Sequence, residues 1–330
     1  MLEIWHGVDP GAAEARLRGL RRRLSELDSA LAGQQALART NPDSFGIALS
    51  GEGLRSMEAE LRRELIEVLR HRQAEHVSIV LDGPNFVEHS AKFSDLGPIF
   101  TRMQKLFSSI AQAITTGPTT RGPIRSDIMA HTAMRLQATY ASSFGMNVAV
   151  ASNYDVLGES LPSDTLSRLF QLLSATQNDT RLMRVSGEVG RRSLVHLRHL
   201  VKHLRATEAT MNLDWKDFAG TRYEWQVTRE SADNIIASID NITETRSETK
   251  SFDGRLVGAS LLRNRFEVLL DSDNVLEGNF VSGLAGSVQE TFGKRITAIL
   301  DETEVLDRAS GEAKTFYTLK AIHPFPNAIN

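Results

Sequence analysis

The 330-residue sequence contains no cysteine, and this absence excludes disulfides, thiolate metal ligands and cysteine nucleophiles. It also fits a reducing compartment. Long hydrophobic runs are missing too, because no stretch reaches the roughly 18 apolar residues typical of a membrane span. The N-terminus, MLEIWHGVDPG, has no basic region before an apolar run and so does not resemble a signal peptide. We therefore expect a cytoplasmic protein that binds no membrane.

Recognisable catalytic motifs are also missing. The sequence has no GxxxxGK[ST] phosphate loop, no HExxH zinc motif and no GxSxG nucleophile elbow. Residues 271–273, Asp-Ser-Asp, fit a hairpin turn better than a calcium loop, which needs a glycine and a glutamate at fixed positions. His196, His199 and His203 lie along one edge of a predicted helix, but the cations around them would repel a metal ion. The sequence therefore predicts no metal and no cofactor, and no motif identifies a known family.

Charge is distributed unevenly along the chain, whose formal net charge is −3. Residues 1–75 carry 11 Lys and Arg against 12 Asp and Glu, a net charge of −1. Residues 76–205 carry 14 against 9, which gives +5, and residues 206–330 carry 13 against 20, which gives −7. A basic middle and an acidic end indicate complementary surfaces within the molecule, or an anionic partner for the middle segment.

Residues 1–75 are predicted to form an N-terminal helical region with short strands at residues 2–6 and 45–50. Asp9 and Pro10 predict a helix start, since Asp is a favoured N-cap and Pro a favoured first helical residue. Apolar residues then recur at spacings of three and four, which makes a short heptad seam: Ala13, Leu17, Leu20, Leu24, Leu27 and Leu31. After a turn at residues 51–53, a second helix over residues 54–69 could bury this seam. We favour that intramolecular packing, which costs little loop entropy, over self-association with a second subunit.

Residues 76–250 are predicted to form an α+β domain built from repeated units, each with strands and one amphipathic helix. Apolar runs predict its strands at residues 77–81, 134–140, 144–150 and 223–227. The repeat depends on two matching strand starts, SFGI from Ser44 and SFGM from Ser143. Residues 243–251, TETRSETKS, are polar throughout, and we expect them to be a linker.

Residues 251–330 are predicted to form a small β-barrel domain. Strands are expected at residues 255–262, 265–270, 275–281, 295–300 and 315–322, with a short helix at 284–292 between the third and the fourth. This order is typical of an OB-like barrel, and an SH3-like barrel is the alternative. The predicted fold class is therefore α+β: repeated strand-plus-amphipathic-helix units followed by a small OB-like (or SH3-like) β-barrel.

A basic helix ends the middle segment. Seven cations lie within a few turns, opposed only by Asp179 and Glu188: Arg181, Arg184, Arg191, Arg192, Arg198, Lys202 and Arg205. A cationic outer face is what contact with a phosphate backbone requires. The commoner explanation of such a charge run is a solvated face that pairs with the acidic final third. The candidate nucleic-acid-binding residues on the helix 184–205 are Arg184, Arg191, Arg192, Arg198, Lys202 and Arg205.

Three functions remain open from the sequence. We favour a non-enzymatic binding or scaffold component of a bacterial-type cytosolic assembly, which would bind a protein partner or a second copy of itself. A nucleic-acid-binding protein that uses the basic helix is the first alternative. The second alternative is an enzyme whose site is dispersed in the sequence, since such a site leaves no local motif.

Overall fold

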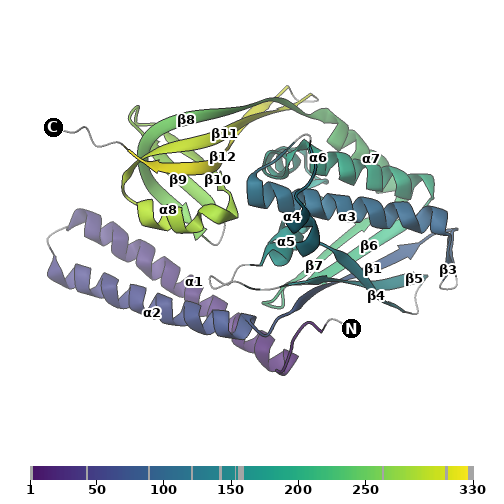
Figure 1. Ribbon diagram of the computed structural model, residues 1–330, viewed down its shortest axis with the longest axis horizontal. Coiled ribbons are helices and arrows are strands. Elements are labelled where there is room, and N and C mark those ends of the chain that lie inside the picture. Colours follow the sequence, from purple (N-terminus) through teal and green to yellow (C-terminus); the bar gives the residue numbers. More distant parts are fainter. Residues whose placement is uncertain are drawn as a thin grey trace.

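A computed structural model describes residues 3–41, 44–87, 90–119, 122–140, 143–152, 154, 160–261, 264–308 and 311–325. The described chain is mixed α and β. Figure 1 shows its three parts: a helical hairpin, a sheet covered by helices, and a barrel. The expected strand at residues 2–6 is reduced to a single bridge between Trp5 and Arg72.

The N-terminal hairpin consists of α1 (Pro10–Thr40) and α2 (Phe45–Leu69), which pack against each other. Helix α1 begins as predicted, because the Asp9 carboxylate accepts a hydrogen bond of 2.7 Å from the Ala12 amide. The whole leucine seam is buried, and its first half shares an apolar cluster with Leu65, Val68 and Leu69 of α2. The hairpin therefore buries the seam within one chain, as favoured above.

The strand predicted at residues 45–50 and the turn predicted at residues 51–53 are wrong, because both segments belong to α2. The two glycines suggested a turn, but Gly51 serves helix packing. A Cβ on Gly51 would lie 2.4 Å from Gln34 Nε2, which itself donates a hydrogen bond of 2.7 Å to the Ile47 carbonyl. The glycine therefore lets α1 and α2 approach each other closely.

The central sheet is antiparallel, with the strand order β4-β5-β1-β6-β7. The four strands predicted in this region are confirmed, whereas the strand over residues 210–216 was not predicted. The bounds are β1 (Ala74–Asp82), β4 (Met134–Tyr140), β5 (Phe144–Ala151), β6 (Thr210–Lys216) and β7 (Arg222–Val227). Alternate residues of β1, such as Val77, Ile79 and Leu81, are buried on one face.

Helices cover that buried face of the sheet (Figure 1). They are α3 (Phe93–Thr116), α5 (Leu161–Ala175), α6 (Asp179–Ala206) and α7 (Arg229–Asn241). Their apolar residues form one core with the sheet, which includes Phe107 of α3, Phe170 of α5 and Leu197 of α6. Three short elements complete this part: β2 (Phe86–Val87), β3 (Ser90–Ala91) and α4 (Ser126–His131).

The expected repeat of strand-and-helix units is not found. The SFGI segment from Ser44 begins helix α2, whereas Phe144, Gly145 and Met146 of the SFGM segment lie in strand β5. The same short pattern thus adopts two secondary structures, because Gly51 and Gln34 favour helix packing in one place and a partner strand is available in the other.

The C-terminal part is a closed barrel with the strand order β10-β12-β11-β8-β9. Strands β10 and β12 are parallel, and the other neighbouring pairs are antiparallel. The bounds are β8 (Ile242–Ser260), β9 (Arg265–Leu270), β10 (Val275–Phe280), β11 (Arg295–Asp307) and β12 (Ala313–Pro324). A 3₁₀ turn, η2 (Ser282–Leu284), and α8 (Ala285–Thr291) separate β10 from β11. All five predicted strands and the short helix are therefore present.

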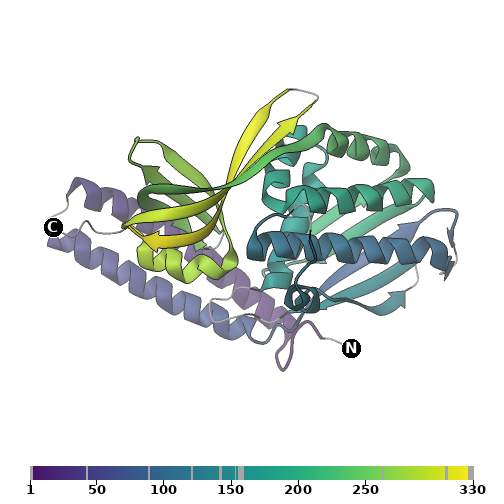
Figure 2. The ribbon, with the colours of Figure 1, turned by 45° about the horizontal axis from the view of Figure 1, so that its top comes forward.

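The predicted linker at residues 243–251 is wrong, because these residues form the first half of β8. Strand β8 follows α7 directly and pairs with β11 along its polar half. Thr249 donates a 2.6 Å hydrogen bond to Asp301, and Lys250 lies 2.8 Å from Glu302. The expected domain boundary at 250–251 thus falls inside a strand. Figure 2 shows β11 and β12 reaching from the barrel toward the helical layer.

Candidate functional site

A cleft lies between the helical layer and the barrel, with a volume of about 490 Å³. Helices α5 and α6 supply one wall, and the start of β9 with the end of β10 supplies the other. The charged residues that line it are Asp164, Arg168, Arg181, Arg184, Glu188 and Arg265. Its volume is within the range of small-molecule sites, and its lining is mostly polar.

A kink in α6 directs the first cations of the basic helix into this cleft. Gly190 adopts φ 76° and ψ 160°, a conformation available almost only to glycine. Its backbone also packs on the loop after α3, since a Cβ there would lie 2.7 Å from the Pro118 Cβ. Residues 179–189 and 191–206 therefore have different axes. Residues before and after the kink can therefore lie on different surfaces, even when counting 100° per residue along the sequence places them on one face.

Three contacts hold the barrel against the helices beside the cleft. A Cβ on Gly187 of α6 would lie 2.4 Å from the Phe316 ring, so the glycine makes room for this aromatic side chain of β12. Lys320 of β12 donates a hydrogen bond to the Thr116 carbonyl at the C-terminal end of α3. A cation at a helix C-terminus also interacts favourably with the helix dipole. Val305 of β11 lies in the main core as well.

The cleft is positively charged, because four arginines face two carboxylates. Arg168 pairs with Glu188, and Arg265 Nη2 lies 4.0 Å from the same Glu188 carboxylate. The guanidinium groups of Arg181 and Arg184 have no ion pair or hydrogen bond among the described residues, and both side chains are exposed. The cleft therefore offers two free guanidinium groups to an anion.

Asn264 adds an unused acceptor to the lining of the cleft. It lies in the turn between β8 and β9 with φ 48°, and its carbonyl accepts a 2.8 Å hydrogen bond from the Phe280 amide. Its side-chain Oδ1 is buried and has no donor within the described chain. A buried acceptor without a donor is costly. A ligand that carries both an anionic group and an N–H or O–H donor would satisfy the arginines and Asn264 together.

The structure separates the six candidate nucleic-acid-binding residues. Only Arg184 lines the cleft, together with Arg181 from the same charge run. Arg198 binds Asp240 of α7 with two nitrogens, and this pairing raises the pKa of Arg198 and lowers that of Asp240. Arg205 lies 2.8 Å from Asp233 of α7. These two arginines therefore pair with the acidic final third.

The other three candidates lie on the outer surface. Arg192 donates a 2.9 Å hydrogen bond to the Gly122 carbonyl, and Arg191 and Lys202 are exposed. Arg168 and Arg265 of the cleft were not identified from the sequence, because they lie far from the basic helix and only tertiary packing brings them to it. The described residues contain no group of three or more His, Asp or Glu placed to hold a metal ion.

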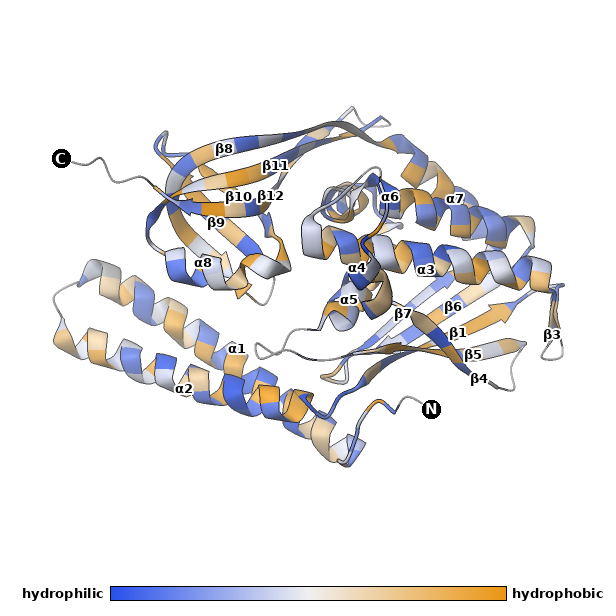
Figure 3. Cartoon of the chain, in the orientation of Figure 1, coloured by the Kyte–Doolittle hydropathy of each residue, from blue (hydrophilic) through white to orange (hydrophobic). Residues whose placement is uncertain are grey.

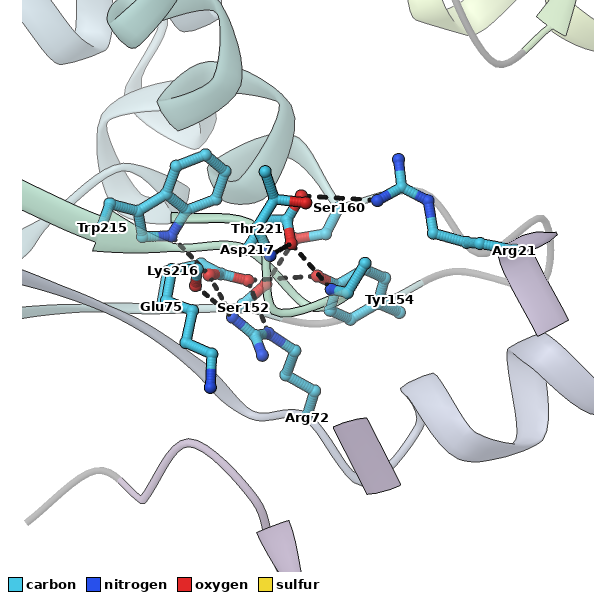
Figure 4. A network of polar contacts seen from close by, with 11 residues as sticks. Arg21, Arg72, Glu75, Ser152, Tyr154, Ser160, Trp215, Lys216, Asp217 and Thr221 are labelled. Carbon is cyan, nitrogen blue, oxygen red and sulfur yellow. Dashed lines mark hydrogen bonds and ion pairs between the residues drawn. The ribbon is translucent and has the colours of Figure 1, made fainter. Parts of the chain in front are cut away.

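A second polar cluster lies at the base of the hairpin and is internally satisfied (Figure 4). The Arg72 guanidinium donates two hydrogen bonds, of 2.9 and 2.7 Å, to the Glu75 carboxylate, and both side chains are buried. Trp215 and Tyr154 donate to the same carboxylate at 2.9 and 3.1 Å. Burial, and then the charge of Glu75, raise the pKa of Tyr154 well above its usual value. This network joins the hairpin to the sheet.

Comparison of the chain with protein-family models, with curated proteins and with solved structures finds no match. Within the described residues, no helix combines the length and the hydropathy needed to cross a membrane.

Proposed function

We propose that the protein is a non-enzymatic binding component whose ligand is a phosphate-bearing anion held in the cleft. The observation that carries this proposal is the convergence of four arginines, from α5, α6 and β9, on one cleft with two carboxylates. The planar guanidinium group can donate two parallel hydrogen bonds to phosphate, which a lysine cannot do. Among the described residues, Arg181 and Arg184 are the two of these arginines without an ion pair or hydrogen bond, so they would contact the phosphate.

We infer further that the barrel is of the OB type. Its strand order, the parallel pairing of β10 with β12 and the helix between β10 and β11 support this inference. OB folds bind ligands on the face of their second and third strands, next to the loop after the first strand. The cleft occupies the equivalent place here, because Asn264, Arg265 and Asn279 line it. Phe280 is buried and offers no stacking surface, which favours recognition of phosphate over recognition of a base.

Calorimetric titration with inorganic pyrophosphate tests the proposal. We expect saturable binding that weakens by about tenfold or more in the Arg181→Gln/Arg184→Gln variant, since two charge-assisted contacts are lost. The Arg22→Gln/Arg23→Gln variant is the matched control, because it removes the same charge from exposed positions of α1. Equal affinities of the two double variants would show that the cleft is not the binding site.

The distal end of the hairpin supports a protein partner, as expected for a scaffold component. Leu37, Phe45 and Leu49 are between 57% and 80% exposed there. Figure 3 shows hydrophobic and hydrophilic residues alternating along both helices. We propose that this end binds a second copy of the chain. Light scattering should then show a dimer that becomes a folded monomer in the Phe45→Ser/Leu49→Ser variant; a monomeric wild-type protein would contradict this.

A further inference from the structure

A second cationic surface lies on the outer side of the helical layer, away from the cleft. The charges of Arg102 and Lys105 of α3, and those of Arg192 and Lys202 of α6, act on the imidazoles of His196 and His199 of α6. We call these six residues the α3–α6 face. The Arg102 guanidinium donates a 2.6 Å hydrogen bond to the His199 carbonyl, so the two helices are in direct contact here.

The lowered pKa values of the two histidines indicate that positive charge is concentrated on the α3–α6 face. Burial lowers the pKa of His196 to about 4, with further contributions from Arg192, Lys105 and His199. Burial also lowers the pKa of His199, together with the charges of Arg102, Arg198, Lys202 and Lys105. The charges that act on both imidazoles are thus all positive.

Acidic residues do not neutralise this face from its own helices. Residues 191–206 of α6 contain no Asp or Glu, and α3 contains only Asp95, near its start. Asp240 of α7 binds Arg198, and its charge also acts on Lys202, which lies one turn further along α6. Lys105 and Lys202 are exposed, and neither makes a hydrogen bond or an ion pair within 4.0 Å in the described part of the chain. The face therefore carries a net positive charge that an external anion can neutralise.

We infer that the α3–α6 face binds the phosphate backbone of a double-stranded nucleic acid, without reading its sequence. Charge complementarity identifies the partner as a polyanion. The six residues include no Phe, Tyr or Trp, so single-strand binding by base stacking on a large aromatic ring is not supported. Arg192 and Lys202 are ten residues apart, about 15 Å along a helix, so their long side chains can reach phosphates on both sides of a groove about 12 Å wide.

This surface differs from the one expected from the sequence. Arg198 and Arg205 no longer belong to it, because α7 neutralises them, and Arg184 lies in the cleft. Arg102 and Lys105 of α3 take their place. The inference does not depend on the function proposed for the cleft, and the two can fail separately.

Fluorescence anisotropy with a labelled 20-base-pair DNA duplex tests the inference. About four phosphate contacts predict a slope of log K against log salt of roughly −3 to −4, at about 0.9 per contact. In the Lys105→Gln/Lys202→Gln variant we expect about tenfold weaker binding at low salt and a slope smaller by roughly 2. The Arg181→Gln/Arg184→Gln variant should bind the duplex as the wild-type protein does.

Two further variants are matched controls. Arg22→Gln/Arg23→Gln removes the same charge from α1, and Arg198→Gln/Asp240→Asn removes a neutral ion pair from α6 and α7 without changing the net charge. Both should bind the duplex within about twofold of the wild-type protein, because neither changes a phosphate contact. A loss as large as that of the lysine variant would attribute binding to overall charge and would overturn the inference.

The pKa of His199, measured by NMR with and without the duplex, provides a second test. A purely structural role of the lysines would not change this pKa when the duplex is added. Duplex phosphates next to the imidazoles should raise the pKa of His199, because they stabilise the protonated ring. Three results would overturn the inference: no duplex binding at low salt, tighter binding of a single strand than of the duplex, or lysine-dependent binding only to vesicles that contain phosphatidylserine.

Discussion

At the scale of single residues, the buried Arg72–Glu75 pair gives a prediction about stability. The two side chains are 2% and 0% exposed. We predict that Glu75→Gln lowers the free energy of unfolding by about 3–5 kcal/mol, since it leaves a buried guanidinium without a counter-charge. Urea denaturation measures this value. The exposed Arg70–Glu67 pair is the control, and Glu67→Gln should cost less than about 0.5 kcal/mol. Equal losses in both variants would contradict this account of the network.

His196 gives a prediction about pH. Its pKa of about 4 in the folded protein lies below the usual value of 6.5, so the unfolded chain binds the proton more tightly. The resulting stabilisation is complete above pH 6.5 and is lost as the pH falls from 6.5 toward 4. The stability advantage of the wild-type protein over His196→Gln should therefore shrink between pH 7.5 and pH 5 in urea denaturation. His323→Gln, at an exposed position of the barrel, is the control. An advantage that stays constant would show that His196 titrates alike in the folded and unfolded protein.

At the scale of elements, the kink in α6 connects backbone conformation to the cleft. Gly190→Ala would place a Cβ 2.7 Å from the Pro118 Cβ at a φ of 76°. We predict a loss of about 1–3 kcal/mol in the free energy of unfolding and weaker binding of pyrophosphate, because Arg184 would be redirected. Gly33→Ala in α1 has open space and should raise stability by up to about 1 kcal/mol. If the Gly190→Ala protein is destabilised but binds pyrophosphate with unchanged affinity, the kink does not position the residues that bind the anion.

The elements also show which sequence patterns were informative. Alternation of apolar residues in β1, β5 and the barrel strands predicted their positions, because one face of each strand is buried in a core. The same alternation at Phe45, Ile47 and Leu49 was misleading, since packing of α2 on α1 overrides local propensity. The polar run TETRSETKS carries no apolar signal, yet cross-strand pairs with β11 make it a strand.

At the scale of the whole molecule, the barrel could be predicted from the sequence, but the cleft could not. The barrel follows from five strands that are neighbours along the chain. The cleft brings together Arg168, Arg184 and Arg265, which come from α5, α6 and β9. Their proximity depends on the kink at Gly190 and on the space that Gly187 leaves for the Phe316 ring. Neither effect can be derived from the spacing of residues in the sequence.

Protection of a single introduced thiol tests the central claim, that the cleft binds a phosphate-bearing anion. The chain has no cysteine, so Ser167→Cys places one reactive thiol in the lining of the cleft. We predict that saturating pyrophosphate slows its alkylation by iodoacetamide several-fold, because the bound anion blocks access to the thiol and its charge disfavours the reactive thiolate form. The exposed control Ser56→Cys on α2 should react at the same rate with and without pyrophosphate. Equal alkylation rates at position 167 with and without pyrophosphate would contradict the claim.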